Sequence, residues 1–245
     1  MSQGRAIVTG AASGIGEGAA RRLLEEGCSV IAVDINEAGL ESIVSEGAEP
    51  LVADLADLDD RDRVIAAGQG CDYMVNAAGI IRAKELSDFT VTDWRDIFTV
   101  NVESMFFLCQ GIGPTMRPGG SIVNLSSSSA KLAKTIEVAI YAASKTTVLS
   151  ITRSFAYAFA DIPVRVNAIC PAIIDTPMQD KVLAEVAPMR GMTVEELTTA
   201  RNATVPLGRA ASPAELAGLI WFLLSDEAGY MTGQTINYGG GFVTW

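Results

Sequence analysis

The sequence predicts an α/β fold in which helices cover both faces of a parallel β-sheet. Short apolar runs of strand length alternate along the chain with longer segments of helical periodicity. The short runs have continuous apolar stretches at their centres, which is typical of strands buried on both faces of a parallel sheet. No internal repeat, low-complexity tract or linker rich in Pro and Gly divides the 245 residues. We therefore expect a single domain, 1–245.

Seven apolar runs are the expected strands, and the strand–helix alternation favours a seven-stranded parallel sheet. They are 5–9 (RAIVT), 29–34 (SVIAVD), 49–54 (EPLVAD), 72–77 (DYMVNA), 121–126 (SIVNLS), 164–170 (VRVNAIC) and 235–238 (TINY). The segments of helical period between them are the expected helices: 14–26, 37–46, 59–68, 93–116, 141–160 and 213–224.

One segment interrupts the alternation between the sixth and seventh strands. Residues 175–208 contain roughly two short helical patterns in a place where a compact domain normally has a short loop. An insertion of this length is commonly a lid or a substrate-binding element, so we expect a substrate lid here. A surface elaboration without function is the alternative.

The composition indicates a soluble globular protein with one well-buried core, because 49% of the residues are hydrophobic and 19% are charged. The formal net charge of -11 argues against general affinity for nucleic acid or anionic membranes. We expect neither kind of partner. An anionic ligand is compatible with this balance, since local fields and backbone dipoles can oppose the global sign.

The N-terminus and the cysteines favour a cytoplasmic location. MSQGRAIVTG enters a strand without the regions of a secretory signal. The longest apolar run, 216–224, is about half of what a bilayer crossing needs. The widely spaced cysteines form no CxxC pattern, so we expect buried thiols and no metal site, an ion at an oligomer axis being the alternative. The cysteines are Cys28, Cys71, Cys109 and Cys170.

A glycine-rich turn, TGAASGIG, joins the first strand to the first helix. Gly10, Gly14 and Gly16 allow backbone N–H groups and the helix N-terminus to approach a pyrophosphate. Asp34 closes the second strand, where a carboxylate can accept hydrogen bonds from an adenosine ribose and repel a 2′-phosphate. No Arg or Lys occupies 11–15 or 35–40. The pattern predicts NAD rather than NADP; an ordinary strand-end acid is the alternative.

Two further strand ends carry candidate cofactor contacts. Asp54, after the third strand, is placed to meet the adenine amino group, with a helix-capping role as the alternative. NAAG at 76–79 ends the fourth strand with small residues that permit close approach of a cofactor. A plain strand-to-loop turn is the alternative there.

TGAASGIG, NAAG, Asn101, a serine after the fifth strand and YAASK together resemble the short-chain dehydrogenase/reductase family. The resemblance runs from residue 5 to the glycines at 239–241. It implies one Rossmann-type, doubly wound domain, a nicotinamide cofactor and a homotetramer or homodimer. The cofactor-binding positions that it implies are Gly10, Ser13, Gly14, Ile15, Gly16, Asp34, Ile35, Asp54, Leu55, Asn76, Ala78, Gly79, Tyr141, Lys145, Pro171, Ile174 and Thr176.

The YAASK motif offers a replacement for histidine, of which the chain has none. By the resemblance, Tyr141 is the catalytic acid/base. A free phenol has a pKa of about 10 and is a poor base at neutral pH. Lys145, four residues on, shares the helix face, so we expect its ammonium to favour tyrosinate and also to bind the nicotinamide ribose. A buried tyrosine beside a surface lysine is the alternative.

Two polar residues complete the implied catalytic set. Asn101 resembles the family asparagine that holds a water behind the lysine for proton relay; an amide that satisfies a local helix kink is the alternative. The catalytic serine orients the substrate carbonyl. Spacing to the tyrosine selects Ser128, whereas register from the strand selects Ser127, and we adopt Ser127 because strand register fixes side-chain direction.

PAIIDTPM at 171–178 resembles the family segment that follows the sixth strand. The backbone of Ile174 is expected to hold the nicotinamide carboxamide and Thr176 to assist near it or the pyrophosphate. Ala172 replaces the usual glycine, which leaves the path of the loop open.

The segment NAAGIIRAKELSDFTVTDWRDIF and the C-terminal GGGFVTW resemble bacterial sugar-acid and polyol dehydrogenases, including 2-keto-3-deoxygluconate dehydrogenases. A small-molecule alcohol or ketone of that kind is the expected substrate. Arg82 and Arg190 are candidates to bind a substrate carboxylate, although each could be a solvated surface residue. A 3-oxoacyl-carrier-protein reductase, which normally uses NADPH, and a non-catalytic dinucleotide sensor are the alternatives. Met105, Phe106 and Phe107 are expected in the core or a subunit interface.

Overall fold

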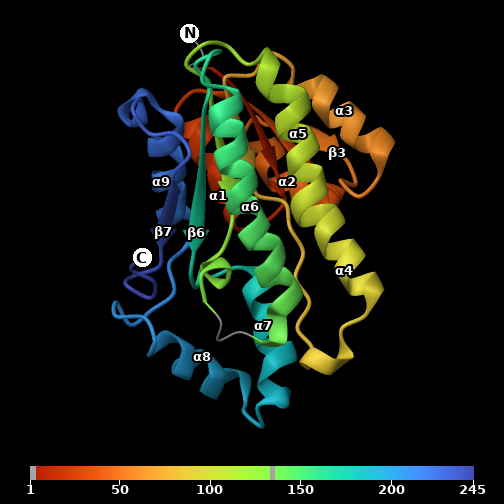
Figure 1. Cartoon of the computed structure of the whole chain (residues 1–245), viewed down its shortest axis with the longest axis vertical. Helices are drawn as coiled ribbons and strands as arrows, with labels where there is room; N and C mark the ends of the chain where they lie inside the picture. The colour runs from red at the N-terminus through yellow and green to blue at the C-terminus, as the bar shows by residue number, and fades with distance from the viewer. Residues whose placement is uncertain (1–3, 133–135) are drawn as a thin grey trace.

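The computed structural model describes residues 4–132 and 136–245, and seven of its strands form one all-parallel sheet (Figure 1). Their order is β3-β2-β1-β4-β5-β6-β7. This confirms the predicted fold class. The bounds are β1 (Arg5–Thr9), β2 (Ser29–Asp34), β3 (Glu49–Val52), β4 (Tyr73–Asn76), β5 (Ser121–Leu125), β6 (Arg165–Pro171) and β7 (Thr235–Tyr238).

The strand order reverses direction next to β1, which positions the site. From β1 the chain first builds outward through β2 and β3, and then returns to place β4 on the other side of β1. Loops that leave β1 and β4 therefore diverge and open a crevice at the carboxyl ends of the strands, which is where open α/β sheets bind ligands.

Helices cover both faces of the sheet. Ala6 and Val8 of β1 pack with α1, α2 and α9 on one face, while Ile7 between them packs with α3, α5 and α6 on the other. This alternation follows from the two-residue period of a strand. The helices are α1 (Gly14–Glu25), α2 (Glu37–Ser45), α3 (Leu58–Gly68), α4 (Val91–Phe98), α5 (Ser104–Ile112), α6 (Ala139–Ala158), α7 (Pro177–Met189), α8 (Val194–Asn202) and α9 (Pro213–Leu224).

The helix expected over 93–116 is interrupted. The chain forms α4, then a π-helical turn, η2 (Thr99–Glu103), then α5 and a 3-10 turn, η3 (Gly113–Thr115). The π turn contains Asn101, whose side chain bonds to the backbone of the segment after β4. A single wide turn inside an α-helix often marks a functional position. Apolar periodicity alone predicts one uninterrupted helix here, and that prediction is wrong.

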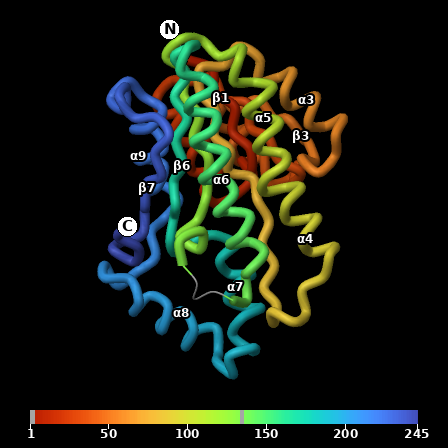
Figure 2. Tube along the Cα trace, in the orientation of Figure 1, coloured from red at the N-terminus to blue at the C-terminus, as the bar shows by residue number. Residues whose placement is uncertain are grey.

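The insertion at 175–208 forms two short helices, as its sequence pattern predicts. Thr176 caps α7, with Pro177 at its first turn, and Thr193 caps α8 through a reciprocal bond with Glu196. Leu197 of α8 is 1% exposed in a cluster that includes Val182 of α7 and Tyr141 of α6. The trace shows α7 and α8 extending beyond the carboxyl ends of the strands (Figure 2).

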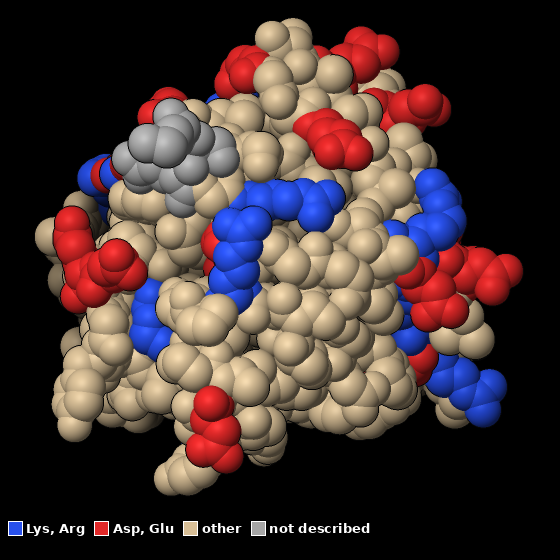
Figure 3. Space-filling model, turned by 90° about the horizontal axis from the view of Figure 1, so that it is seen from above, with Lys and Arg blue, Asp and Glu red and all other residues tan. Residues whose placement is uncertain are grey.

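The opposite end of the molecule carries the amino ends of the strands. On this face basic and acidic side chains are interspersed with uncharged ones (Figure 3). Within residues 4–132 and 136–245, no helix has both the length and the apolar character that a membrane crossing requires.

Candidate functional site

Two adjoining cavities lie at the carboxyl ends of the strands. The glycine-turn cavity, of about 330 Å³, is lined by the β1–α1 turn, the ends of β2, β3 and β4, and Lys145. The lid cavity, of about 430 Å³, is lined by the segment after β5, the end of β6, α7 and α8. The residues that line both are Ile15, Ser126, Tyr141, Thr176 and Met178. Tyr141 therefore lies where the two cavities meet.

The glycine turn is shaped for close approach of a ligand backbone. Gly10 has φ +70° and Gly14 has φ +56°, a region that residues with a side chain rarely adopt. A Cβ on Gly10 would lie 2.8 Å from the backbone nitrogen of Ala78, so β1 and β4 can approach only with glycine there. A Cβ on Gly16 would overlap the carbonyl oxygen of Gly10. The first turn of α1 thus presents free N–H groups to the cavity, where a pyrophosphate fits.

Ser13 stands at the N-cap of α1, and its side chain makes no capping hydrogen bond. The hydroxyl is exposed beside the first N–H groups of the helix and lines the glycine-turn cavity with Ile15. Thr176 closes the opposite side: a Cβ on Gly14 would lie 3.1 Å from its Cγ2 atom. Both side chains therefore line the cavity, and their contacts to a pyrophosphate stay a prediction.

Asp34 is held in place by its own turn. Its Oδ2 accepts from the backbone N–H of Ala12 at 3.0 Å and its Oδ1 accepts from that of Asn36 at 2.9 Å. Each oxygen keeps a lone pair for another donor. The carboxylate lines the glycine-turn cavity beside Ile35, which is 64% exposed. Both oxygens are thus available as acceptors, and the predicted bond to a ribose diol stays a prediction.

Asp54 and Leu55 line the same end of this cavity. Asp54 accepts from the backbone N–H of Ala56 at 2.9 Å and so orders the turn after β3. The helix-capping alternative is wrong, since Asp57 caps α3. Leu55 is 7% exposed and forms part of the apolar wall.

Asn76 is the one predicted cofactor contact that lines neither cavity. It is 5% exposed, and its amide nitrogen donates to Asn124 Oδ1 at 2.8 Å and to Cys109 Sγ at 3.3 Å. Those bonds tie β4 to β5 and α5 beneath the site. Ala78 and Gly79, by contrast, line the glycine-turn cavity as predicted.

Ser127, Tyr141 and Lys145 converge near the junction of the cavities. The Ser127 side chain lies close enough to the Tyr141 phenol to lower the pKa of that phenol. Lys145 Nζ donates to the carbonyl oxygen of Leu125 at 2.8 Å and lies 5.7 Å from the centre of the Tyr141 ring. The helix period places Tyr141 and Lys145 on one face of α6, which is buried. Ser128 also lines the lid cavity and begins a 3-10 turn.

Burial shifts the pKa values of both Tyr141 and Lys145. Burial raises the pKa of Tyr141 to about 12, and the Ser127 side chain lowers it only in part. Burial also lowers the pKa of Lys145 to about 8. In the protein alone, burial therefore favours the neutral phenol. That Lys145, together with the charge of a bound nicotinamide, favours tyrosinate stays a prediction. The phenol is protonated at neutral pH.

Asn101 lies behind Lys145, in the π turn. Its Oδ1 accepts from the N–H of Ile80 at 2.7 Å, and its Nδ2 donates to the carbonyl of Ile80 at 2.9 Å and to Ser144 Oγ at 3.1 Å. A Cβ on Gly79 would lie 3.2 Å from Asn101 Oδ1 and 3.4 Å from Lys145 Nζ. The side chain thus binds the loop after β4 beside the lysine; the proposed water relay stays a prediction.

The segment after β6 follows a regular path despite Ala172. No non-glycine residue of the described chain has a positive φ, and Ala172 donates its N–H to the carbonyl of Tyr238 at 3.0 Å. Alanine therefore fits without strain. Pro171 and Ile174 line the lid cavity, and Ile174 is also bridged to Ala211.

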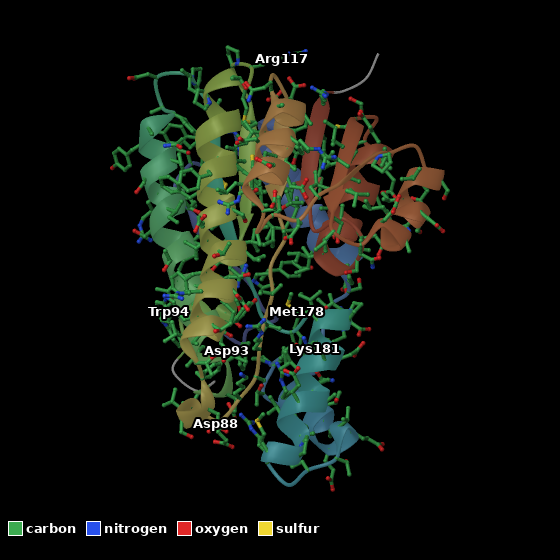
Figure 4. The ribbon with its side chains drawn as sticks, turned by 90° about the vertical axis from the view of Figure 1, so that its right-hand side faces the viewer. Asp88, Asp93, Trp94, Arg117, Met178 and Lys181 are labelled. Atoms are coloured by element: carbon green, nitrogen blue, oxygen red, sulfur yellow. The ribbon has the colours of Figure 1, made fainter. Side chains whose placement is uncertain are left out.

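Arg82 lines neither cavity, so the structure does not support its predicted role in binding a substrate carboxylate. Its guanidinium forms ion pairs with Asp93 at 3.2 Å and Asp96 at 2.8 Å. Lys84 also pairs with Asp93, at 2.7 Å. Figure 4 shows Asp93 on α4, across from α7, which carries Met178. Through these ion pairs, Arg82 holds the segment after β4 against α4.

Arg190 lines the lid cavity as predicted but forms an ion pair with Glu137 at 2.6 Å. Sequence reasoning missed a second arginine of this cavity, Arg201, whose side chain contacts Gln179. A signal was present, because Arg201 is four residues from the apolar Leu197 within one predicted helix.

The remaining candidates are structural. All four cysteines are free and buried, as predicted. Met105 is buried in the core, whereas Phe107 is 43% exposed and contacts Phe106 edge-on. In the described part of the chain, no group of three His, Cys, Asp or Glu residues is arranged to hold a metal ion.

One cavity is lined by a glycine turn and two carboxylates, and Ser127, Tyr141 and Lys145 lie where it meets the second cavity. This arrangement is typical of an oxidoreductase that binds a dinucleotide. A family model described as enoyl-(acyl carrier protein) reductase matches residues 10–243. The chain belongs to the short-chain dehydrogenase/reductase family, whose members use a nicotinamide dinucleotide and act on small molecules.

Curated relatives and solved structures cover nearly the whole chain. It is 35% identical over 97% of its length to the 3-oxoacyl-[acyl-carrier-protein] reductase FabG of Thermotoga maritima, covering 96% of that protein. It is 31% identical over 97% of its length to the 2-keto-3-deoxy-L-fuconate dehydrogenase of Xanthomonas campestris pv. campestris, covering 79% of it. A variant of the actinorhodin polyketide ketoreductase, solved with NADPH, matches with a TM-score of 0.92 at 28% identity, covering 100% of both chains.

Proposed function

We propose that the protein interconverts a secondary alcohol and a ketone with NAD(H), on a sugar, polyol or keto-deoxy sugar acid. The observation that carries this proposal is the position of Tyr141, which lines both the glycine-turn cavity and the lid cavity. A substrate in the lid cavity and a cofactor in the other would meet at its phenol.

The chain's own groups account for the proton transfer. In the reducing direction, the Tyr141 phenol, kept protonated by burial, donates its proton to the carbonyl oxygen of the substrate. The Ser127 hydroxyl donates a hydrogen bond to the same oxygen and holds it in place. NADH, when bound, supplies the hydride. Lys145 binds the nicotinamide ribose in this proposal, and its pKa of about 8 lets it hold or release a proton near neutral pH.

The preference for NAD over NADP rests on the charges of the glycine-turn cavity. Asp34 and Asp54 are acidic. The one cation among the residues that line this cavity is Lys145, which lies beside Tyr141 and away from Asp34. A 2′-phosphate beside Asp34 would meet a like charge with no cation to offset it. The polyketide ketoreductase was solved with NADPH, so the preference is specific to this chain's residues and not a consequence of the fold.

A second candidate is reduction of a 3-oxoacyl thioester. The 35% identity to FabG of Thermotoga maritima favours it, and the family description names an acyl-carrier-protein substrate. The acidic glycine-turn cavity opposes it, since that activity normally accompanies NADPH. A strong preference for NADPH together with turnover of acetoacetyl thioesters would favour this candidate.

An absorbance screen tests the proposal. Polyols, aldonates, keto-deoxy sugar acids and hydroxyacyl compounds are each offered with NAD⁺ and with NADP⁺, with Tyr141→Phe as the inactive control. We expect NAD⁺ reduction with at least one sugar-derived alcohol. Cofactor binding without turnover of any compound would instead indicate a dinucleotide sensor.

We also propose that the protein is a cytoplasmic homotetramer or homodimer. Aromatic side chains of three neighbouring helices support association, because Trp94, Phe107 and Tyr157 are 48%, 43% and 88% exposed. Light scattering coupled to size-exclusion chromatography measures the state directly, and a monomer would refute this assembly.

A further inference from the structure

The lid cavity carries an excess of positive charge within an acidic protein. Its charged lining residues are Glu137, Arg190 and Arg201, which together leave one uncompensated cation. The whole chain has a formal net charge of -11, so a cationic cavity runs against its overall balance. A local field of this sign attracts an anionic ligand.

Arg190 is not the source of that excess. Its Nη2 lies 2.6 Å from Glu137 Oε1, and its Nε donates to the same oxygen at 2.8 Å. The two charges cancel, and the pair joins α7 to the turn before α6. Arg190 is therefore occupied by a structural contact.

Arg201 lacks such a partner among the described residues. No carboxylate lies within ion-pair distance of its guanidinium, and its hydrogen-bond partner is the neutral side chain of Gln179 at 3.4 Å. Arg201 is half-buried, and burial lowers its pKa, as does the charge of Arg190. A partly buried guanidinium without a carboxylate is costly unless a ligand completes it.

The helix position of Arg201 directs it to the cavity. Leu197, one turn earlier on α8, is 1% exposed and packs in the cluster that includes Tyr141. Residues four apart share a helix face, so Arg201 lies on the face of α8 that packs toward the site. A cation in the last turn of a helix also interacts with the helix dipole. That interaction is available to a solvated side chain and does not account for placement in the cavity.

We propose that Arg201 binds a carboxylate of the substrate, and that the substrates are therefore hydroxy or keto acids rather than neutral polyols. This inference rests on the proposed function. The planar guanidinium offers paired donors that match a carboxylate, and Gln179 orients it. The reacting carbon would then lie between two fixed points: Arg201 at the lid, and Ser127 with Tyr141 at the base.

Binding and turnover together test this assignment. Isothermal titration calorimetry on the NAD⁺-loaded protein measures the affinities of erythronate, xylonate and gluconate, each beside its primary amide, and of inorganic phosphate. The variants are Arg201→Gln, Arg201→Lys and the matched control Arg117→Gln. Arg117 is 70% exposed at the far end of the molecule, so its loss changes the net charge equally without touching the lid (Figure 4).

At least one acid should bind the wild type more tightly than its amide. Arg201→Gln should weaken that acid by about 10- to 100-fold, the range for a lost charged hydrogen bond, and leave the amide unchanged. Arg201→Lys should retain part of the affinity, which shows that a loss in Arg201→Gln is not misfolding. Equal binding of acids and amides, or acid binding unaffected by Arg201→Gln, would overturn the inference. Phosphate binding that depends on Arg201, without any acid doing so, would overturn it as well.

The two proposals fail separately. If neutral polyols are turned over and the Arg201→Gln variant has the same activity as the wild type, the proposed oxidoreductase activity stands and the proposed carboxylate site is wrong. If acids bind in a way that depends on Arg201 but no compound is turned over, the proposed carboxylate site stands and the proposed reaction is wrong.

Discussion

Lys145 Nζ lies 5.7 Å from the centre of the Tyr141 ring and donates its hydrogen bond to the carbonyl oxygen of Leu125. The ammonium is therefore beside the ring and is held by the end of β5. Both side chains are buried, and burial disfavours the charged form of each. In the protein alone, the Tyr141 phenol is neutral, and burial makes the charged form of the neighbouring Lys145 less favourable.

Replacing Lys145 should stabilise the fold while it impairs activity. The pKa of Lys145 falls from 10.5 to about 8 on folding, so the unfolded chain binds more protons between these values and stability rises with pH there. At pH 7 the folded protein carries the full cost of the buried ammonium. We expect Lys145→Met to raise Tm at pH 7 by about 2–8 °C. Calorimetry at rising pH should show the gap narrowing above pH 8; a lower Tm for the variant at pH 7 would contradict this.

The pH dependence of reduction follows from the same groups. The Tyr141 phenol, with a pKa of about 12, keeps its proton through the neutral range. Lys145 loses its proton near pH 8. We expect kcat/KM for ketone reduction to fall as pH rises through about 8, while oxidation is favoured above it. A reduction rate that is flat from pH 6 to pH 10 would show that Lys145 does not control the step.

Ser127 and Ser128 can be separated by turnover. The Ser127 side chain lies beside the Tyr141 phenol and lowers its pKa, whereas Ser128 begins the following 3-10 turn. We expect Ser127→Ala to lower kcat by about 100-fold, in line with loss of an oriented donor, and Ser128→Ala to lower it by less than about threefold. If only the Ser128→Ala variant lost activity, the assignment from strand register would be wrong.

The charge of Asp34 should set the cofactor preference. Its carboxylate is fixed by the N–H groups of Ala12 and Asn36 and faces the cavity. Asp34→Ser removes both the ribose acceptor and the like charge, so we expect the ratio of kcat/KM for NAD⁺ over NADP⁺ to drop by about 100-fold, or about 2.7 kcal/mol. Asp57→Ser, which loses an acid that caps α3, is the control. An unchanged ratio in Asp34→Ser would remove the basis for NAD specificity.

Arg82 provides a test of structural against substrate-binding roles. Because it pairs with Asp93 and Asp96, Arg82→Ala should loosen the segment after β4 and raise KM for acidic and neutral substrates alike. A selective loss of acidic substrates in steady-state kinetics would restore the role expected from sequence.

The strands and the glycine turn were predictable because their causes are local. Short, mainly apolar runs that alternate with helical patterns identify the strands, and a turn such as that at Gly10 needs glycine whatever the rest of the chain does. Most of the predicted cofactor contacts converge on the glycine-turn cavity for the same reason, since parallel strands end at one edge, and Pro171 and Ile174 line the adjoining lid cavity. Asn76 departs from this pattern because its partner, Asn124, is on a neighbouring strand.

The misses depend on contacts distant in sequence. The π turn at Asn101 is tied to the backbone of Ile80. The partners of Arg82 lie on α4, and nothing local distinguishes an arginine that meets them from one that faces a cavity. The pKa of Tyr141 sums the solvent excluded by many elements. The spacing from Leu197 indicates that Arg201 lies on the buried face of α8, but it does not say that this face lines a cavity beside Tyr141.

Replacement of one phenolic oxygen tests the central claim most directly. Tyr141→Phe keeps the ring that packs with Val182 and Leu197, and it removes the hydroxyl proton that the proposed reaction transfers. We expect cofactor affinity, measured by NADH fluorescence, to remain within about threefold of the wild type and kcat to fall by about 1,000-fold or more, since general acid catalysis contributes up to 10⁴-fold. Undiminished turnover by the Tyr141→Phe variant would contradict the account.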